Sequence, residues 1–153
     1  EKYSFAYSVK PRTRRLNAVI SGLPSKNARS REAIKLTNWG FRKFDTILVA
    51  SKDEIFETLK VWLGKKSRIN VFVNEDIYLT VPKRKKNTIK AILEYSQPVE
   101  APIKKGDKVA VLNIYIAGEL IKKVDVLSAE DVKKSNIFSR LFKSLNYLVW
   151  GDA

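Results

Sequence analysis

INVFVNEDIYLTVP, residues 69–82, alternates large apolar and polar side chains in two short runs separated by an Asn-Glu-Asp step. An alternation with a period of two puts one set of side chains on a single face of a β-strand. The same period runs from about residue 47 to residue 127, in six segments: 47–51, 58–64, 69–82, 88–96, 108–118 and 120–127. Such closely spaced strands without helices between them predict a small antiparallel β-sandwich or barrel over residues 47–128.

Three polar segments between these strands are predicted to be turns. AGEL at 117–120 and PKRKKN at 82–87 are each expected to close a hairpin, and APIKKGDKV at 101–109 is expected to turn into the start of a strand. The lysines of 82–87 are typical of a solvated hairpin whose charges keep a sheet edge from pairing with another chain. A phosphate clamp or a nuclear signal has a similar composition.

Residues 1–46 show a different pattern. Segments 3–10 and 15–22 are predicted to be strands joined by the basic turn at 11–14, and 23–44 is predicted to be a helix. Ser25 or Asn27 is the expected N-cap, and Ala33, Leu36, Gly40 and Phe44 recur at helical spacing, which gives one apolar face. Two strands and one helix bury too little apolar surface to fold alone. We therefore expect residues 1–46 to be the end of a larger α/β or α+β domain.

Residues 129–153 are predicted to be a linker and an amphipathic helix over 136–150, NIFSRLFKSLNYLVW. On a helical wheel, with Ser135 or Asn136 as the N-cap and Gly151 as the stop, seven apolar residues fall within an arc of about 140°. These residues are Ile137, Phe138, Leu141, Phe142, Leu145, Leu148 and Val149. The segment is too short and too charged to span a bilayer, which needs about 20 apolar residues. Its apolar face is expected to lie on the protein's own core, on a partner, or on a membrane surface.

The composition narrows the possible chemistry. The chain has no cysteine and no histidine, which excludes thiol chemistry, the usual zinc sites and a histidine-based catalytic triad. The net charge of +14 favours an anionic partner such as nucleic acid or anionic lipid. The excess lies at the two ends, because residues 52–131 hold 15 basic and 12 acidic residues. A nucleic-acid-binding protein more often gathers its charge on one element.

Few residues are candidates for a site. Glu75 and Asp76 are adjacent carboxylates, but neighbouring strand residues face opposite ways, so a role in a turn or strand entry is favoured over acid–base catalysis. Trp62 and Tyr78 have the side chains that stack on sugars or bases, yet core packing is the more common role of such residues. Trp39 is expected to lie in the core of the larger domain. No catalytic, cofactor-binding or metal-binding residue is predicted.

Two stretches resemble a known enzyme family, the serine D-alanyl-D-alanine carboxypeptidases, which are low-molecular-mass penicillin-binding proteins. RLNAVISGLPSKNARSREAIKLTNWGFRKFDT (15–46) resembles the last strand and helix of their transpeptidase domain. Residues 74–132, above all DIYLTVPK and APIKKGDKV, resemble their β-rich C-terminal domain. The tail resembles their amphipathic membrane anchor. The resemblance implies a transpeptidase remnant at 1–46, a β-sandwich stalk at 47–128, and a linker with an anchor helix at 129–153.

The family's catalysis needs a Ser-x-x-Lys pair, a Ser-x-Asn element and a Lys-Thr-Gly strand. In this chain no serine precedes a lysine by three residues, and Lys-Thr-Gly is absent. Ser25-Lys26-Asn27 spells Ser-x-Asn, but it lies after the expected position of the Lys-Thr-Gly strand, so helix capping is favoured. We expect the chain to begin just beyond Lys-Thr-Gly and to be inactive alone.

The resemblance implies a parent enzyme that trims the terminal D-alanine from peptidoglycan stem peptides through an acyl-enzyme, without a cofactor. It would be attached to the periplasmic face of the bacterial inner membrane. The anionic membrane surface would bind the seven apolar residues above together with Trp150, Arg140 and Lys143, and peptidoglycan would bind the absent catalytic domain. Self-association through the N-terminal hairpin or the terminal helix is a further expectation. The alternative is a basic β-domain adaptor that binds nucleic acid or a protein partner.

Overall fold

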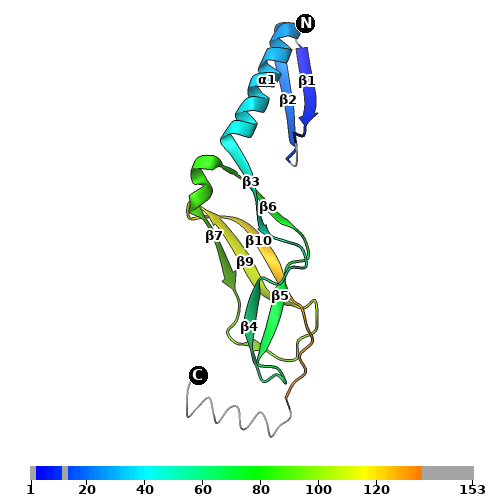
Figure 1. The fold of residues 1–153 in the computed structure, drawn as a ribbon, viewed down its shortest axis with the longest axis vertical. Helices are drawn as coiled ribbons and strands as arrows, with labels where there is room; N and C mark the ends of the chain where they lie inside the picture. Colours follow the sequence, from blue (N-terminus) through cyan, green and yellow to red (C-terminus); the bar gives the residue numbers. More distant parts are fainter. Residues whose placement is uncertain (1–2, 12–13, 136–153) are drawn as a thin grey trace. The chain divides into compact units, whose positions relative to one another are not determined.

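The computed structural model describes residues 3–11 and 14–135 (Figure 1). The chain divides into two compact units, one of residues 1–47 and 79–87 and the other of residues 48–78 and 88–153. In chain order the elements are β1 (Tyr3–Val9), β2 (Leu16–Leu23), α1 (Lys26–Lys43), β3 (Phe44–Ala50), β4 (Glu57–Trp62), β5 (Arg68–Phe72), β6 (Ile77–Pro82), the 3-10 helix η1 (Lys83–Thr88), β7 (Ile89–Glu94), β8 (Val99–Glu100), β9 (Lys108–Ile116) and β10 (Glu119–Ser128). The fold is mainly β, as predicted.

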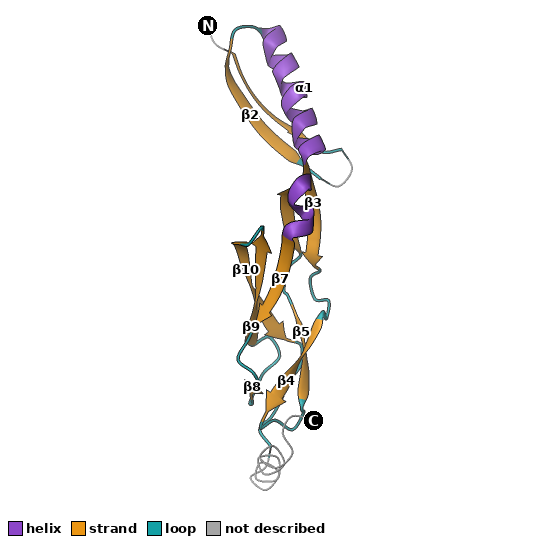
Figure 2. Cartoon of the chain, turned by 90° about the vertical axis from the view of Figure 1, so that its left-hand side faces the viewer, coloured by secondary structure: helices purple, strands orange, loops and turns teal. Residues whose placement is uncertain are grey.

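The first unit contains the predicted hairpin and helix. Strands β1 and β2 pair antiparallel, with Tyr7 opposite Ala18, and α1 lies beside β2 (Figure 2). Ser25 is the N-cap, and its hydroxyl accepts a hydrogen bond from the Ala28 N–H at 3.1 Å, so the predicted capping role is confirmed. The Tyr7 hydroxyl donates to the Ala33 carbonyl at 2.8 Å and thereby joins the strand to the helix.

Close packing explains why a glycine occupies position 40 in α1. Gly40 is buried, and a Cβ atom there would lie 2.4 Å from Leu16 Cδ1. Atoms at that distance overlap strongly, so a larger residue would require the Leu16 side chain to move. The apolar face predicted from Ala33, Leu36, Gly40 and Phe44 is therefore the face that packs on the hairpin at Ala33 and Gly40.

The second unit is built on a curled six-stranded sheet with the strand order β7-β9-β10-β5-β4-β8. All neighbouring strands pair antiparallel except β4 and β8, which pair parallel. Buried side chains alternate with exposed ones in β5 and in β6, as the period of two predicts. The largest fully buried apolar side chains are Leu59, Ile69, Val71, Val73, Ile77, Val81, Ile114, Val126 and Val132.

Two of the three predicted turns have the expected form. Ala117 and Gly118 join β9 to β10 with φ values of 51° and 84°. Positive φ at both central residues is the geometry of a type I′ hairpin, whose twist matches that of the flanking strands. Gly106, with φ of 89°, turns the chain two residues before β9 begins.

The predicted hairpin at 82–87 is wrong. Residues Lys83–Thr88 form the 3-10 helix η1, and the strands on either side of it belong to different sheets, since β6 pairs with β3 and β7 pairs with β9. Pro82 supplies a physical reason, because a proline has no N–H for a strand ladder and its fixed φ suits a helical turn. No residue of η1 is buried, so the expectation that these lysines are solvated holds.

The expectation that Tyr78 is a core residue is also wrong. Tyr78 is 56% exposed, because it occupies an outward position in the alternation of β6 between buried Ile77 and Leu79. Trp62 is half-buried at the end of β4. Trp39, assigned from the sequence to the core of a larger domain, is 48% exposed and contacts the Phe44 ring edge-to-face at 5.1 Å between centroids.

The β domain continues past residue 128, where the sequence analysis placed the start of a linker. Val132 forms an isolated antiparallel bridge with Ile103, and Lys134 forms one with Gly64. Residues 129–135 therefore pair with the β-sheet unit. The predicted helix at 136–150 lies outside the described residues. Among the residues that are described, no helix is long and apolar enough to cross a membrane.

Candidate functional site

The structure separates the residues that resembled catalytic groups. Ser25 caps α1, and the Asp76 carboxylate accepts a hydrogen bond from the Lys52 N–H at 2.8 Å. Glu75 instead lies 3.6 Å from the Lys122 ammonium in an exposed ion pair. These contacts support the predicted turn role of Glu75 and Asp76. Within residues 3–11 and 14–135 there is no group of three His, Cys, Asp or Glu side chains that could hold a metal ion.

Instead, the last described residues, which lead into the predicted anchor, make many hydrogen bonds to the β-sheet unit. We call residues 129–135 the terminal strap. Its backbone bonds to three segments. The Ala129 N–H donates to the Asn70 carbonyl at 2.9 Å, and the Val132 and Ile103 backbones exchange hydrogen bonds of 2.8 and 2.9 Å on one side. On the other side, the Lys65 N–H donates to the Lys133 carbonyl and the Ser135 N–H donates to the Leu63 carbonyl, both at 2.9 Å. The strap is therefore held from both sides.

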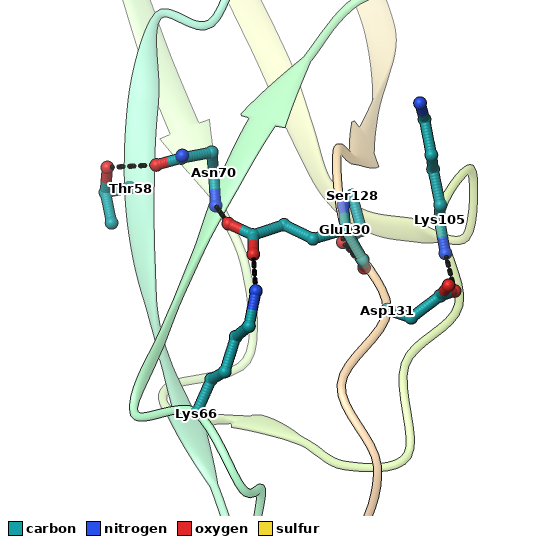
Figure 3. A network of polar contacts seen from close by, with 7 residues as sticks. All are labelled: Thr58, Lys66, Asn70, Lys105, Ser128, Glu130 and Asp131. Atoms are coloured by element: carbon teal, nitrogen blue, oxygen red, sulfur yellow. Dashed lines mark hydrogen bonds and ion pairs between the residues drawn. The ribbon is translucent and has the colours of Figure 1, made fainter.

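Glu130 is the main polar residue of the terminal strap (Figure 3). One of its carboxylate oxygens accepts from the Lys66 ammonium, and the other accepts from the Asn70 N–H at 3.3 Å. Its carbonyl accepts a 2.7 Å hydrogen bond from the buried Ser128 hydroxyl. The Asn70 side chain in turn accepts from Thr58 at 3.0 Å, which extends the network to β4. A single carboxylate thus joins the strap to β5 and to the loop between β4 and β5.

These contacts change the acidity of Glu130. The hydrogen bond from Lys66 is the largest cause, and the Asn70 N–H adds to it, so the pKa of Glu130 lies below its ordinary value of 4.5. Both partners favour the charged carboxylate. The Glu130 side chain is 26% exposed and that of Lys66 is 55% exposed. Solvent therefore screens the pair, and its contribution is mainly to position the strap.

A second carboxylate fixes the strap on the opposite side. Asp131 accepts a hydrogen bond from the Lys105 N–H at 2.8 Å (Figure 3). Lys105 lies in the turn that Asp107 also stabilises, by accepting from the Lys104 N–H at 2.8 Å. The turn predicted at 101–109 therefore both starts β9 and holds the strap.

Apolar packing completes the attachment of the strap. Val132 is only 1% exposed, and its Cγ1 atom would lie 2.6 Å from a Cβ atom added at Gly64. The same Cβ would lie 2.8 Å from Val61 Cγ1. Glycine at position 64 is what allows the strap to approach the end of β4 this closely.

Sequence reasoning did not find Glu130, Lys66 or Gly64. The predicted membrane-binding residues, from Ile137 to Trp150, lie outside the described residues. A signal for the strap was present in SAEDV at 128–132, where two adjacent carboxylates, Glu130 and Asp131, precede an apolar residue just after a strand. It was not specific, because a solvated linker has the same composition.

Comparison with known proteins identifies this architecture. The family description "Penicillin-binding protein 5, C-terminal domain" matches residues 44–134, which is more than half of the chain and ends within the strap. The chain belongs to this family. The penicillin-binding protein 5 C-terminal domain family thus accounts for the β-sheet unit, and the resemblance stated from the sequence is confirmed.

Curated relatives of this family extend the similarity across the front of the chain. The chain is 30% identical over 141 residues to the D-alanyl-D-alanine carboxypeptidase DacC of Escherichia coli K12, covering 92% of this chain and 35% of that protein. It is 32% identical over 130 residues to DacD of Salmonella typhimurium, covering 84% of this chain and 33% of that protein. The chain therefore spans about a third of the length of these relatives.

Solved structures show the same fold. Penicillin-binding protein 5 from Haemophilus influenzae superimposes with a TM-score of 0.74 at 26% identity, over 86% of this chain and 39% of that one. The carboxypeptidase DacD from Francisella tularensis superimposes with a TM-score of 0.64 at 26% identity, over 87% of this chain and 33% of that one.

Proposed function

We propose that this chain is the C-terminal part of a serine-type D-alanyl-D-alanine carboxypeptidase and that it attaches the parent enzyme to a membrane. The curated relatives that it matches are named D-alanyl-D-alanine carboxypeptidases, and this chain corresponds to about a third of their length. The parent would trim the terminal D-alanine of peptidoglycan stem peptides at the periplasmic face of the inner membrane, through an acyl-enzyme and without a cofactor.

The observation that supports attachment is the terminal strap. A segment that connects a membrane-bound helix to a folded domain can set the distance between them only if the segment is fixed to the domain where the chain leaves it. The strap has backbone bonds on both sides, a buried valine and two bonded carboxylates directly before residue 136. The sequence that follows it carries the amphipathic pattern over 136–150. A rigid strap before an amphipathic segment suits a stalk that holds a catalytic domain at a set distance from a lipid surface.

The energetic argument for lipid as the partner combines area and charge. Seven large apolar side chains at roughly 1.5–3 kcal/mol each give about 10–20 kcal/mol for full burial, of which interfacial burial realises a part. Lys133, Lys134, Arg140 and Lys143 each add up to about 1 kcal/mol near anionic lipid. Trp150 has the side chain type that favours the headgroup region.

Co-sedimentation with anionic vesicles tests the attachment. The intact chain should bind, and a chain that ends at Ser135, which keeps the complete strap, should not. Leu141→Asp with Leu145→Asp should lose most binding. Ser139→Asp with Ser144→Asp makes the same charge change on the polar side of the predicted helix and should retain it. Equal binding by all four proteins would show that charge alone is responsible and would contradict the anchor.

Labelling by a fluorescent penicillin tests the assignment of activity. The longer parent protein should be labelled covalently at a serine, because an acyl-enzyme forms with penicillin as it does with substrate. This chain alone should neither be labelled nor hydrolyse a D-Ala-D-Ala peptide. Labelling of any of its serines would contradict the proposal.

A salt-titrated DNA-binding assay tests the alternative of a nucleic-acid adaptor. That alternative requires the logarithm of the affinity for DNA to fall steeply with the logarithm of the salt concentration.

A further inference from the structure

The first compact unit contains a basic pocket for which the proposed function has no use. We call it the Trp39 pocket. It has a cavity volume of about 480 Å³ and is lined by Trp39, Arg42, Lys43, Phe44, Pro82, Lys83 and Arg84. Ligand sites of roughly 300–1,000 Å³ take small organic molecules, so this volume suits a ligand the size of one or two sugar rings. Four of the seven lining residues are cations.

The charges of the pocket are largely uncompensated. Lys83 lies 3.8 Å from the Asp45 carboxylate, in a pair whose side chains are 50% and 38% exposed. In the described part of the chain no carboxylate lies within ion-pair distance of Arg42, Lys43 or Arg84. Like charges gathered on one surface repel one another and are stabilised by an anion that binds between them.

A structural role for Arg42 and Lys43 is the obvious alternative, since cations near the C-terminus of a helix interact favourably with its last carbonyls. Two carbonyls at this end of the helix already have donors. The Arg14 guanidinium donates to the Phe44 carbonyl and, at 3.4 Å, to the Gly40 carbonyl, which also accepts from the Phe44 N–H. The side chains of Arg42 and Lys43 are exposed and line the pocket.

The apolar part of the pocket specifies a second feature of the ligand. Trp39 is 48% exposed and is braced by Phe44, whose ring meets it edge-to-face at an interplanar angle of 70°. A half-exposed indole held in place offers a rigid face on which a ring can stack. Arginine beside it provides the fork of donors that matches a phosphate group.

We propose that the Trp39 pocket binds a phosphate ester whose organic part is a ring. Arg42 and Arg84 hold the phosphate, and the ring lies against Trp39 and Pro82. Inorganic phosphate lacks the ring, and a neutral sugar lacks the charge, so both bind more weakly than the ester. The ester is either a free sugar phosphate or a ring-bearing phospholipid headgroup. This inference does not depend on the membrane anchor or on the parent's activity.

Glucose 1-phosphate is the soluble probe, with calorimetry for affinity and the indole N–H signals in two-dimensional NMR for location. Trp39→Phe identifies the Trp39 signal, which should shift on titration. Arg42→Gln with Arg84→Gln should weaken binding at least about tenfold, because two charge-assisted hydrogen bonds are lost. Lys90→Gln with Lys104→Gln makes the same charge change at exposed positions elsewhere and should alter affinity less than twofold. Thermal melts of all variants establish that each is folded.

Any of three results would overturn the proposal. One is an equal loss of affinity in the Lys90 and Lys104 control, which would mean that net charge alone attracts the ester. The second is a Trp39 signal that does not move on titration, and the third is inorganic phosphate binding as tightly as glucose 1-phosphate. Vesicles containing phosphatidylinositol separate the two sources. If the Arg42 and Arg84 variant loses affinity for these vesicles, the source is lipid, and if it loses affinity only for glucose 1-phosphate, the source is soluble.

Discussion

Glu130 shows how one side chain can hold a whole segment, the terminal strap, in place. It contacts Lys66 and Asn70 through its carboxylate and Ser128 through its backbone. Lys66 and Asn70 both lie at least 60 residues before Glu130 in the chain, so loss of the carboxylate releases two long-range contacts together. In sequence Glu130 is one of 16 acidic residues and carries no distinguishing pattern. Only the pairing of β4, β5 and β10 brings its partners around it, which is why it could not be predicted.

The pH dependence of the terminal strap follows from Glu130. Its pKa is lowered in the folded protein, so its stabilisation is fully present above the ordinary value of 4.5 and is lost as the pH falls through the lower folded value. Protection of the strap amides against hydrogen exchange should therefore fall in acid relative to that of the rest of the sheet. Glu130→Gln should cost about 1 kcal/mol at pH 7 and flatten this dependence. Glu119→Gln, at the exposed start of β10, should change neither; an identical effect would contradict the role of Glu130.

Gly64 is the second residue on which the strap depends. Gly64→Ala should destabilise the domain by about 1–3 kcal/mol, because the added methyl overlaps Val132 and Val61. Denaturant unfolding measures the cost. Val132→Ala removes one of the overlapping methyl groups, so the double variant should lose less stability than the two single changes added together. Strict additivity would show that the two positions do not touch.

At the scale of secondary-structure elements, the N-cap of α1 is a feature that the sequence predicts. Ser25→Ala should cost about 0.5–2 kcal/mol, because the Ala28 N–H loses its acceptor. Ser25→Asp provides an equivalent acceptor and should retain most of the stability, measured by thermal unfolding followed by circular dichroism. If the aspartate variant is as unstable as the alanine variant, hydrogen bonding at the cap is not the cause.

The elements that local patterns specify were predicted, and those that tertiary pairing specifies were not. The alternation in β5 and β6, the hairpin turn at Ala117 and Gly118, and the cap at Ser25 each follow from a few neighbouring residues. The 3-10 helix η1 was missed because a basic polar run fits several kinds of connection. Tyr78 was misplaced because both faces of an isolated strand pattern carry large side chains.

At the scale of the whole molecule, the front of the chain should govern association. Val19 is 76% exposed and Ile34 is 61% exposed on the unit built from the β1–β2 hairpin and α1. Exposed apolar side chains beside open strand edges tend to pair with a second copy. Light scattering should show association that grows with concentration, and Val19→Lys with Ile34→Lys should reduce it. A monodisperse monomer at all concentrations would contradict this expectation.

The double-sided attachment of the terminal strap has a mechanical consequence. The bridges of Val132 with Ile103 and of Lys134 with Gly64 are antiparallel, and their hydrogen bonds lie across the direction of the chain. A pull on the end of the protein, as a tether would exert, loads these bonds in shear and must break them together rather than one by one. Single-molecule pulling from the C-terminus should therefore give a high rupture force. Glu130→Gln and Gly64→Ala should lower that force, because forced unfolding follows the unfolding rate, and Glu119→Gln should leave it unchanged.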